Sequence, residues 1–273
     1  MTATSSNTKP RPVALVTGAS SGIGQSFARM LARGGHDLVL VARDIARLEA
    51  LAKEVDAQCG ATSDVLPADL CDREQLACIE ARLRAAPAID VLINNAGFGT
   101  YGKFHELDID GEDREVQLNI TALMRLTHAA LDAMVPRGSG SILNVSSVAA
   151  MQPVPGDAVY AATKAFVLNF SEALHEELRG TGVTVTVLAP GFTRTEFQER
   201  ADYDASNVPG FMWQDADEVV EAALGAMAKK RAVVVPGVLN RMTASLSAMT
   251  PHAITRRVSG RVGACRHASA CMS

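Results

Sequence analysis

The sequence predicts a single α/β domain in which a parallel sheet of about seven strands is covered by helices on both faces. Short runs rich in Val, Ile and Leu recur along the chain, and longer segments with helical periodicity separate most of them. Strands that are apolar throughout are typical of a parallel sheet buried on both faces. About seven such strands in a chain of 273 residues indicate a doubly wound, Rossmann-type domain.

The expected strands follow one another with room for a helix between most pairs. We expect strands at 13–17, 38–42, 63–67, 90–94, 141–146, 183–188 and 232–235. Between the first two, residues 27–35 present an apolar helical face before a Gly-Gly stop. The longest expected helix covers 157–179, where Asp157 can cap the start and Gly180 can end the helix.

The composition and net charge argue against several kinds of partner and site. A net charge of -4 does not favour nucleic acid as a partner. The five cysteines are odd in number and form no C-x-x-C pair, so we expect neither a disulfide framework nor a metal site, and a reducing cytoplasm fits. The first residues lack an apolar signal core, and no run approaches the ~18 apolar residues of a transmembrane helix.

The two ends of the chain differ from the domain between them. We expect residues 1–11 to be a disordered lead-in, 12–236 to form the domain, and 237–273 to be a basic, partly helical extension. The extension holds five arginines and no acidic residue. It either packs on the acidic body of the same chain or contacts an anionic acyl carrier, coenzyme A or a membrane surface.

A glycine-rich turn follows the first expected strand. The segment TGASSGIG, residues 17–24, leads directly into a helix. Its glycines allow the backbone to approach a pyrophosphate closely, and the helix N-terminus supplies free N–H groups. The alternative is a merely structural turn. The expected dinucleotide contacts are Gly18, Ser20, Ser21, Gly22, Ile23 and Gly24.

The end of the second strand favours NADP(H) over NAD(H). An acidic residue at this position would bond the ribose 2'-OH of NAD, but Ala42 stands there and Arg43 follows, which suits a 2'-phosphate. The alternative is that Arg43 is a solvated charge and Asp44 only a helix cap. After the third strand, Asp69 and Leu70 are expected beside the adenine ring, unless Asp69 only caps the next helix.

Tyr160 and Lys164 form a suggestive pair. On a helix, positions i and i+4 share a face. The pKa of a free phenol is about 10, and a nearby ammonium lowers it toward the working range of a proton donor. A chance pairing is the alternative.

Three further motifs occur in strand order. NNAG (94–97) follows the fourth strand, NVSS (144–147) the fifth and APGFTRT (189–195) the sixth. Together with T-G-x-x-x-G-x-G and Y-x-x-x-K, this set resembles the short-chain dehydrogenase/reductase superfamily, in its compact branch of about 250 residues. The resemblance covers roughly 12–236.

The resemblance implies a catalytic tetrad. Tyr160 is expected to be the general acid for carbonyl reduction, or the base for the reverse oxidation. Lys164 is expected to lower its pKa and to hold the nicotinamide ribose. Ser147, thirteen residues before Tyr160, would bond the substrate oxygen, with Ser146 facing the other way. Asn119 would anchor a water in the proton relay, although it is otherwise only a poor helix former in a helix.

The same resemblance implies further cofactor contacts and the substrate pocket. Asn94 is expected to support the sheet beside the adenosine. The remaining expected cofactor residues are Asn95, Ala96, Gly97, Tyr160, Lys164, Pro190, Gly191, Thr193 and Thr195. The expected substrate residues are Phe98, Ala149, Met151, Phe192 and Trp213, which suit a hydrophobic fatty-acyl, steroid or aromatic ketone, unless these apolar side chains only close the core. Residues 196–213 are expected to form a mobile lid.

The family also implies a homodimer or homotetramer through the helices around 112–135 and 157–179. The ending VVVPG before the extension weakly favours the branch of bacterial ketoacyl reductases. Three other functions are the alternatives. They are an NAD-dependent alcohol dehydrogenase of the same family, a non-catalytic dinucleotide-sensing protein and a sugar-nucleotide epimerase of the extended branch.

Overall fold

A computed structural model describes residues 10–201, 203, 205, 208–250 and 256–257. Seven parallel strands form one sheet in the order β3-β2-β1-β4-β5-β6-β7. The chain therefore builds one half outward from β1 and then returns to build the other half from β4, which places a switch point between these two strands. The strands are β1 (Val13–Thr17), β2 (Asp37–Ala42), β3 (Ser63–Pro67), β4 (Val91–Asn94), β5 (Gly140–Val145), β6 (Val183–Leu188) and β7 (Val233–Val234).

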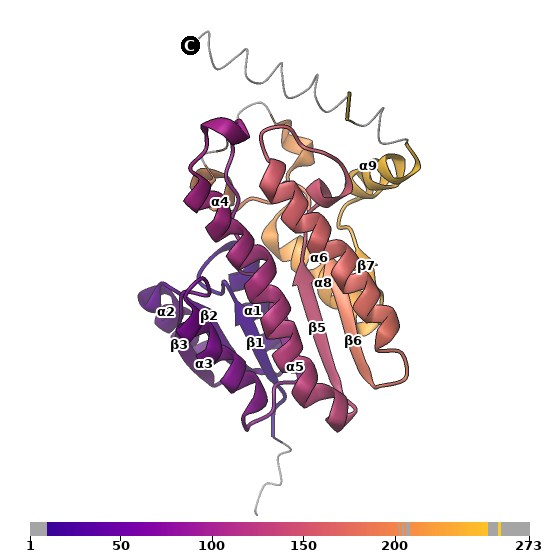
Figure 1. Cartoon of the computed structure of the whole chain (residues 1–273). Helices are drawn as coiled ribbons and strands as arrows, with labels where there is room; N and C mark the ends of the chain where they lie inside the picture. The colour runs from indigo at the N-terminus through magenta and orange to yellow at the C-terminus, as the bar shows by residue number, and fades with distance from the viewer. Residues whose placement is uncertain (1–9, 202, 204, 206–207, 251–255, 258–273) are drawn as a thin grey trace, which may run out of the picture.

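Helices cover both faces of this sheet (Figure 1). The α-helices among the described residues are α1 (Gly22–Arg33), α2 (Ile45–Cys59), α3 (Arg73–Arg84), α4 (Ile109–Val116), α5 (Leu123–Arg137), α6 (Ala158–Glu177), α7 (Phe197–Arg200), α8 (Ala216–Ala228) and α9 (Val238–Met249). A π-helical turn, η2 (Gln117–Ala122), joins α4 to α5, and a 3-10 turn, η3 (Val148–Met151), follows β5. The predicted fold class is confirmed, and the last strand is shorter than expected.

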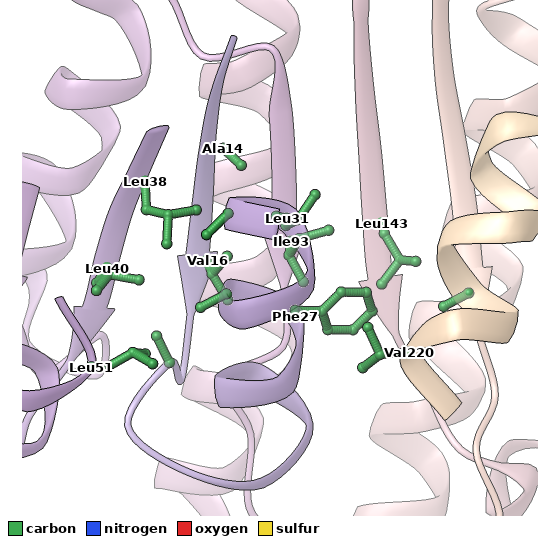
Figure 2. Close-up of a cluster of buried hydrophobic side chains, with 14 of the residues drawn as sticks. Ala14, Val16, Phe27, Leu31, Leu38, Leu40, Leu51, Ile93, Leu143 and Val220 are labelled. Atoms are coloured by element: carbon green, nitrogen blue, oxygen red, sulfur yellow. The ribbon is translucent and has the colours of Figure 1, made fainter. Parts of the chain in front are cut away.

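Each face of the sheet has its own apolar core. On one face α1, α2 and α8 pack on the strands, and Phe27 of α1 is fully buried there beside Val220 of α8 (Figure 2). On the other face Leu76 of α3 and Leu126 of α5 belong to a second buried cluster. Because both faces are covered, the strands are apolar throughout, as the sequence indicated.

One expected helix cap and one alternative cap differ from the structure. Asp157 holds the N-cap position of α6, but its side chain makes no capping hydrogen bond. Asp72, rather than Asp69, caps α3, and its carboxylate accepts from the Glu74 and Gln75 N–H groups at 2.9 and 3.0 Å. Asp44 does cap α2.

Within the described parts of the chain, no helix has the length and apolar character needed to cross a bilayer. Most of the expected basic extension lies outside the described residues, apart from α9 and residues 256–257.

Candidate active site

The glycine-rich turn forms a cradle at the switch point of the sheet. Gly18 has a φ of +66°, which side chains rarely adopt. A Cβ on Gly24 would clash with the carbonyl oxygen of Gly18, so the turn and α1 meet backbone to backbone. Asn95 braces the turn, because its Nδ2 donates to the Thr17 carbonyl at 3.0 Å. Ser21 precedes α1 without capping it, which leaves the helix N–H groups available to an anion.

Thr195 lies against this cradle, since its Cγ2 is 2.9 Å from the position of a Cβ on Gly22. The APGFTRT segment and the glycine-rich turn therefore face each other, as expected for two sides of a dinucleotide site. Pro190 accepts a hydrogen bond from the Val148 N–H at 3.0 Å, which joins the same segment to η3. Thr193 is buried, and its hydroxyl donates to the Gly191 carbonyl at 3.1 Å.

The adenosine end combines a cation with a carboxylate. Arg43 is exposed at the end of β2, and no described residue forms an ion pair or hydrogen bond with it. Asp69 accepts from the Cys71 N–H at 3.0 Å and from Arg114 at 3.1 Å. Burial opposes ionisation of Asp69, but these donors outweigh it and hold its pKa below the usual value. Leu70 is buried beside it.

The cradle, the uncapped start of α1 and the unpartnered Arg43 guanidinium together fit the phosphates of a nicotinamide dinucleotide.

The four expected catalytic residues converge from three elements. Ser147 follows β5 and caps η3, which packs against α6, the helix that carries Tyr160. The serine side chain lies close enough to the phenol to lower its pKa. Lys164 lies one turn further along α6; its Nζ donates to the Val145 carbonyl at 3.1 Å and lies 5.6 Å from the centroid of the Tyr160 ring. Ser146 faces the other way and donates to the Lys164 carbonyl at 2.7 Å.

Asn119 reaches this group through the π-helical turn η2. Its Nδ2 donates to the Phe98 carbonyl at 2.8 Å and to Thr163 Oγ1 at 3.1 Å, while its Oδ1 accepts from the Phe98 N–H at 3.2 Å. Single π-helical turns occur mostly at functional sites, because the inserted residue re-aims the side chains around it. Asn119 thereby ties α6 to the loop after β4.

The pKa of Tyr160 differs from the expected direction. Burial of the hydroxyl raises its pKa well above the usual value, the Ser147 hydrogen bond works in the opposite direction, and Asp157 and Glu115 add to the rise. Burial also lowers the pKa of Lys164 to about 8, with Glu115 opposing. The desolvated lysine is thus a weaker source of positive charge than the sequence suggested. A phenol that keeps its proton suits a general acid.

The expected substrate residues lie in the segments that follow β4, β5 and β6. All five are half-buried, and Phe192 contacts Trp213 with ring centroids 5.6 Å apart. Phe98 is held by Asn119, and the Ala149 N–H donates to Ser147 Oγ at 3.1 Å. A cavity of about 450 Å³ lies beside Trp213, and none of the four expected catalytic residues lines it. Its lining residues are Arg194, Thr195, Gln198, Glu199, Tyr203, Ala205 and Trp213.

Sequence reasoning missed several residues around the tetrad. Phe197 of α7 packs on Tyr160 with ring centroids 5.5 Å apart. Glu112 and Glu115 are buried on α4 and contact Thr100. Two glutamates three residues apart share a helix face, which was a weak available signal. Asn94, as expected, supports the sheet, because its Nδ2 donates to Asn144 of β5 at 2.9 Å and to Thr127 of α5 at 3.0 Å.

Known proteins share this arrangement. The sequence profile described as short chain dehydrogenase matches residues 12–205. A short-chain dehydrogenase from Sphingobium yanoikuyae, solved in complex with NADPH, is 40% identical, with 89% of this chain and 97% of that chain covered and a TM-score of 0.80. A bulky-bulky ketone specific alcohol dehydrogenase from Comamonas testosteroni is 38% identical, with 89% and 96% covered and a TM-score of 0.76.

A curated relative, the very-long-chain 3-oxoacyl-CoA reductase of Anas platyrhynchos, is 33% identical over 221 residues, which are 78% of this chain and 68% of the relative. The profile, the relatives and the solved structures agree with the fold and with the motifs in this chain. The protein therefore belongs to the short-chain dehydrogenase family of oxidoreductases, which act on alcohols and ketones with a nicotinamide dinucleotide.

Proposed function

We propose that the protein is an NADP(H)-dependent oxidoreductase that interconverts a hydrophobic ketone and its secondary alcohol. The convergence of Ser147 and Tyr160, with buried Lys164 at 5.6 Å from the centre of the phenol ring, is the observation that carries this proposal. Two hydroxyl donors that converge beside an apolar surface are what carbonyl reduction requires, because negative charge develops on the substrate oxygen.

In the proposed mechanism, Ser147 and Tyr160 bind the carbonyl oxygen and orient it. The bound dinucleotide supplies the hydride. Tyr160 then gives its hydroxyl proton to the substrate oxygen, and in the oxidative direction it takes that proton back. The raised pKa of Tyr160 keeps the proton in place until the oxygen becomes basic. Asn119 hydrogen-bonds with the backbone of Phe98. It thereby holds the loop that carries this apolar side chain in a fixed position relative to the tetrad.

Arg43 supports the preference for NADP(H). It lies at the end of β2 without an ion-pair partner among the described residues, whereas Arg47 on the next helix is bound to Glu196 at 2.8 Å. A free guanidinium matches the geometry of a phosphate. The solved relative from Sphingobium yanoikuyae, in complex with NADPH, adds support.

The substrate class follows from the apolar side chains around the tetrad. Phe98, Met151, Phe192 and Trp213 suit a bulky hydrophobic ketone. The names of two relatives point the same way, one toward bulky-bulky ketones and the other toward a 3-oxoacyl-CoA. Steroid ketones, aromatic ketones and long-chain 3-ketoacyl thioesters are therefore the substrates to test.

The assembly that we propose is a homodimer or homotetramer through α5 and α6. Both helices carry exposed large apolar side chains, namely Met124 and Val135 on α5 and Phe166 on α6. Such side chains are common at subunit interfaces. The division into a domain over 12–236 with flanking ends, the cytoplasmic location and the contacts of the basic extension stay predictions from the sequence.

The test is nicotinamide absorbance over time with NADPH and NADH in parallel, against these three substrate groups. We expect turnover with NADPH that is lost in Tyr160→Phe, which removes only the hydroxyl. Tight NADPH binding without turnover on any substrate would instead favour the dinucleotide-sensing alternative. Turnover with NADH alone would favour the NAD-dependent alternative.

A further inference from the structure

A four-residue segment after β4, with the sequence GFGT (97–100), lies against three of the four expected catalytic residues. We call this segment the strap. Each of its residues either packs on a tetrad side chain or is hydrogen-bonded by a buried side chain of α4 or η2. The proposed mechanism involves the strap only through Asn119 and Phe98, so the far end of the strap has no role in it.

The two glycines of the strap are in close contact with tetrad side chains. A Cβ on Gly97 would come 2.8 Å from Asn119 Oδ1 and 3.3 Å from Lys164 Nζ. A Cβ on Gly99 would come 2.8 Å from Cδ2 and 3.2 Å from Cγ of the Tyr160 ring. Gly99 is not among the glycines with a positive φ, so the nearness of the ring, rather than backbone strain, favours glycine there. The strap backbone therefore packs directly on the phenol ring.

Three polar side chains from one stretch of the chain hold the strap. They are Glu112 and Glu115 on α4 and Asn119 on η2, with 4%, 0% and 1% of their surfaces exposed. Their spacing of three and then four residues places them on one helix face. Polar side chains buried to this degree need hydrogen-bond partners, because leaving water is unfavourable for them. All three have partners in the strap.

These hydrogen bonds fix the strap at two residues. Asn119 binds the N–H and the carbonyl of Phe98 at 3.2 and 2.8 Å. Glu115 Oε2 accepts from the Thr100 N–H at 3.0 Å. The Thr100 hydroxyl contacts both Glu112 Oε1 and Glu115 Oε2, the latter at 3.2 Å. The glycine between Phe98 and Thr100, which packs on the phenol, is thus anchored on both sides.

The Thr100 anchor is satisfied when the two carboxyl groups share one proton. A hydroxyl has one proton to donate, so it cannot serve two carboxylates at once. Burial, the largest cause, raises the pKa of Glu115 to about 7, which agrees with a carboxyl that retains a proton. Hydrogen bonds to the remaining carboxylate are charge-assisted and stronger than those between neutral groups. The far end of the strap is therefore held firmly.

The Tyr160 ring has a second neighbour in Phe197 of α7, with ring centroids 5.5 Å apart and 50° between the ring planes. The strap backbone and this side chain are contacts that the phenol ring makes outside its own helix. A proton donor works only when its hydroxyl is aimed at the reacting oxygen, and an error of about 1 Å can cost about 10²-fold in rate. The contacts that orient the ring are therefore part of what a proton transfer needs.

We propose that Thr100 is a positioning residue: anchored by Glu112 and Glu115, it holds the Gly99 backbone on the Tyr160 ring and so sets the direction of the phenol hydroxyl. No covalent step is involved. The consequence for catalysis rests on the proposed function, whereas the placement of the ring does not.

The placement of the ring can be followed in the full chain without substrate. The chain has three tyrosines, so carbon-13 labelling of the tyrosine rings gives few NMR signals, and Tyr160→Phe identifies those of Tyr160. We expect Thr100→Val to shift these signals, because it removes the anchoring hydroxyl. Thr100→Ser keeps the hydroxyl and should restore the parent spectrum. The matched control is Thr121→Val, the same exchange at an exposed threonine of η2, which should leave the signals in place.

The second readout is NADPH-dependent reduction of the ketones named above. We expect Thr100→Val to lower kcat by about 10- to 100-fold with little change in the Kd for NADPH, because the donor is misaimed while the cradle is intact. Thr100→Ser should recover most of this loss. A kcat per folded molecule that is unchanged in Thr100→Val would mean a merely structural role.

Unchanged Tyr160 signals in Thr100→Val would overturn the proposal, as would an equal shift in Thr121→Val or no recovery in Thr100→Ser. If circular dichroism shows that Thr100→Val does not fold, Glu112→Ala takes its place, because it removes one of the two carboxyl partners of Thr100. The Tyr160 signals should then shift in the same way, and unmoved signals would again overturn the proposal. If no ketone is turned over, the proposed function fails, and the ring signals still decide the role of the strap.

Discussion

Ser146 donates its hydroxyl proton to the Lys164 carbonyl at 2.7 Å and is thereby locked onto the backbone of α6. Its neighbour Ser147 points to the opposite side, where its hydroxyl meets Tyr160. Two adjacent serines at the end of β5 therefore have separate tasks, one in holding the helix and one in the reaction that we propose. This division leads to the first prediction.

Ser147→Ala should lower kcat/KM by about 10²–10³ with little change in stability, because it removes one donor to the developing oxyanion. Ser146→Ala should do the reverse and cost about 1 kcal/mol of stability, because it removes a buried hydrogen bond that ties the end of β5 to α6. Steady-state kinetics and urea unfolding of both variants check the pair. Equal kinetic losses in the two variants would contradict the assignment.

Gly24→Ala should impair dinucleotide binding, because its Cβ would clash with the Gly18 carbonyl and push the cradle apart. The matched control is Gly225→Ala in α8, where a Cβ meets nothing within 4 Å. There the exchange should stabilise the helix by about 0.5–1 kcal/mol. Titration of protein fluorescence with NADPH measures the first effect and thermal unfolding the second. NADPH binding that survives in Gly24→Ala would argue against the cradle as the pyrophosphate site.

Arg43→Ala should raise the KM for NADPH about tenfold or more and leave the KM for NADH nearly unchanged. The reason is that a charge-assisted hydrogen bond to a phosphate contributes about 1.5–3 kcal/mol. Arg47→Ala provides the control, since this guanidinium is occupied by Glu196 at 2.8 and 2.9 Å. Equal changes for both cofactors in Arg43→Ala would show that Arg43 is only a surface charge.

Glu115→Gln should be more stable than the parent protein at about pH 8, by up to about 3 kcal/mol. The folded carboxyl has a pKa of about 7 against a reference value of 4.5. Between these values the folded protein keeps a proton that the unfolded chain has released, so stability is lost as the pH rises through this window. Urea unfolding near pH 4 and near pH 8 measures the difference, which should vanish at the lower pH. A difference that is independent of pH would contradict the titration.

Phe166→Asp should convert the proposed oligomer to monomers. Phe166 is exposed on α6 and stacks on Phe170 with ring centroids 5.5 Å apart, and a charge there would be buried at the interface that we propose. Ile45→Asp is the control, since Ile45 is an exposed apolar residue on α2. Light scattering after size-exclusion chromatography gives the masses. A monomeric parent protein would contradict the proposed assembly.

Much of the fold could be predicted because its signals are local. Val13–Thr17 and Val183–Leu188 are rich in valine and leucine with threonine as their only polar residue type, and they form strands of the predicted extent. The positions of the four expected catalytic residues could also be predicted, because a motif at the end of a parallel strand lies at the carboxyl edge of the sheet. Their catalytic roles stay a prediction. The spacing from Ser147 to Tyr160 thus selected the serine that meets the phenol.

Only the tertiary structure determined the hydrogen-bond partners and the pKa values of these residues. The π-helical turn at Asn119 depends on partners at Phe98 and Thr163, which come from separate segments. The raised pKa of Tyr160 and the lowered pKa of Lys164 arise from desolvation, which depends on every segment packed around them.

The sequence by itself thus determined the order of strands and helices, the position of the glycine-rich cradle and the choice of candidate catalytic residues, because periodicity and spacing are properties of neighbouring residues. It did not determine that Glu112 and Glu115 share Thr100, or that both glutamates are buried. Those contacts join residues from different elements, and the energy of a buried charge depends on the low-dielectric surroundings that only the folded chain provides.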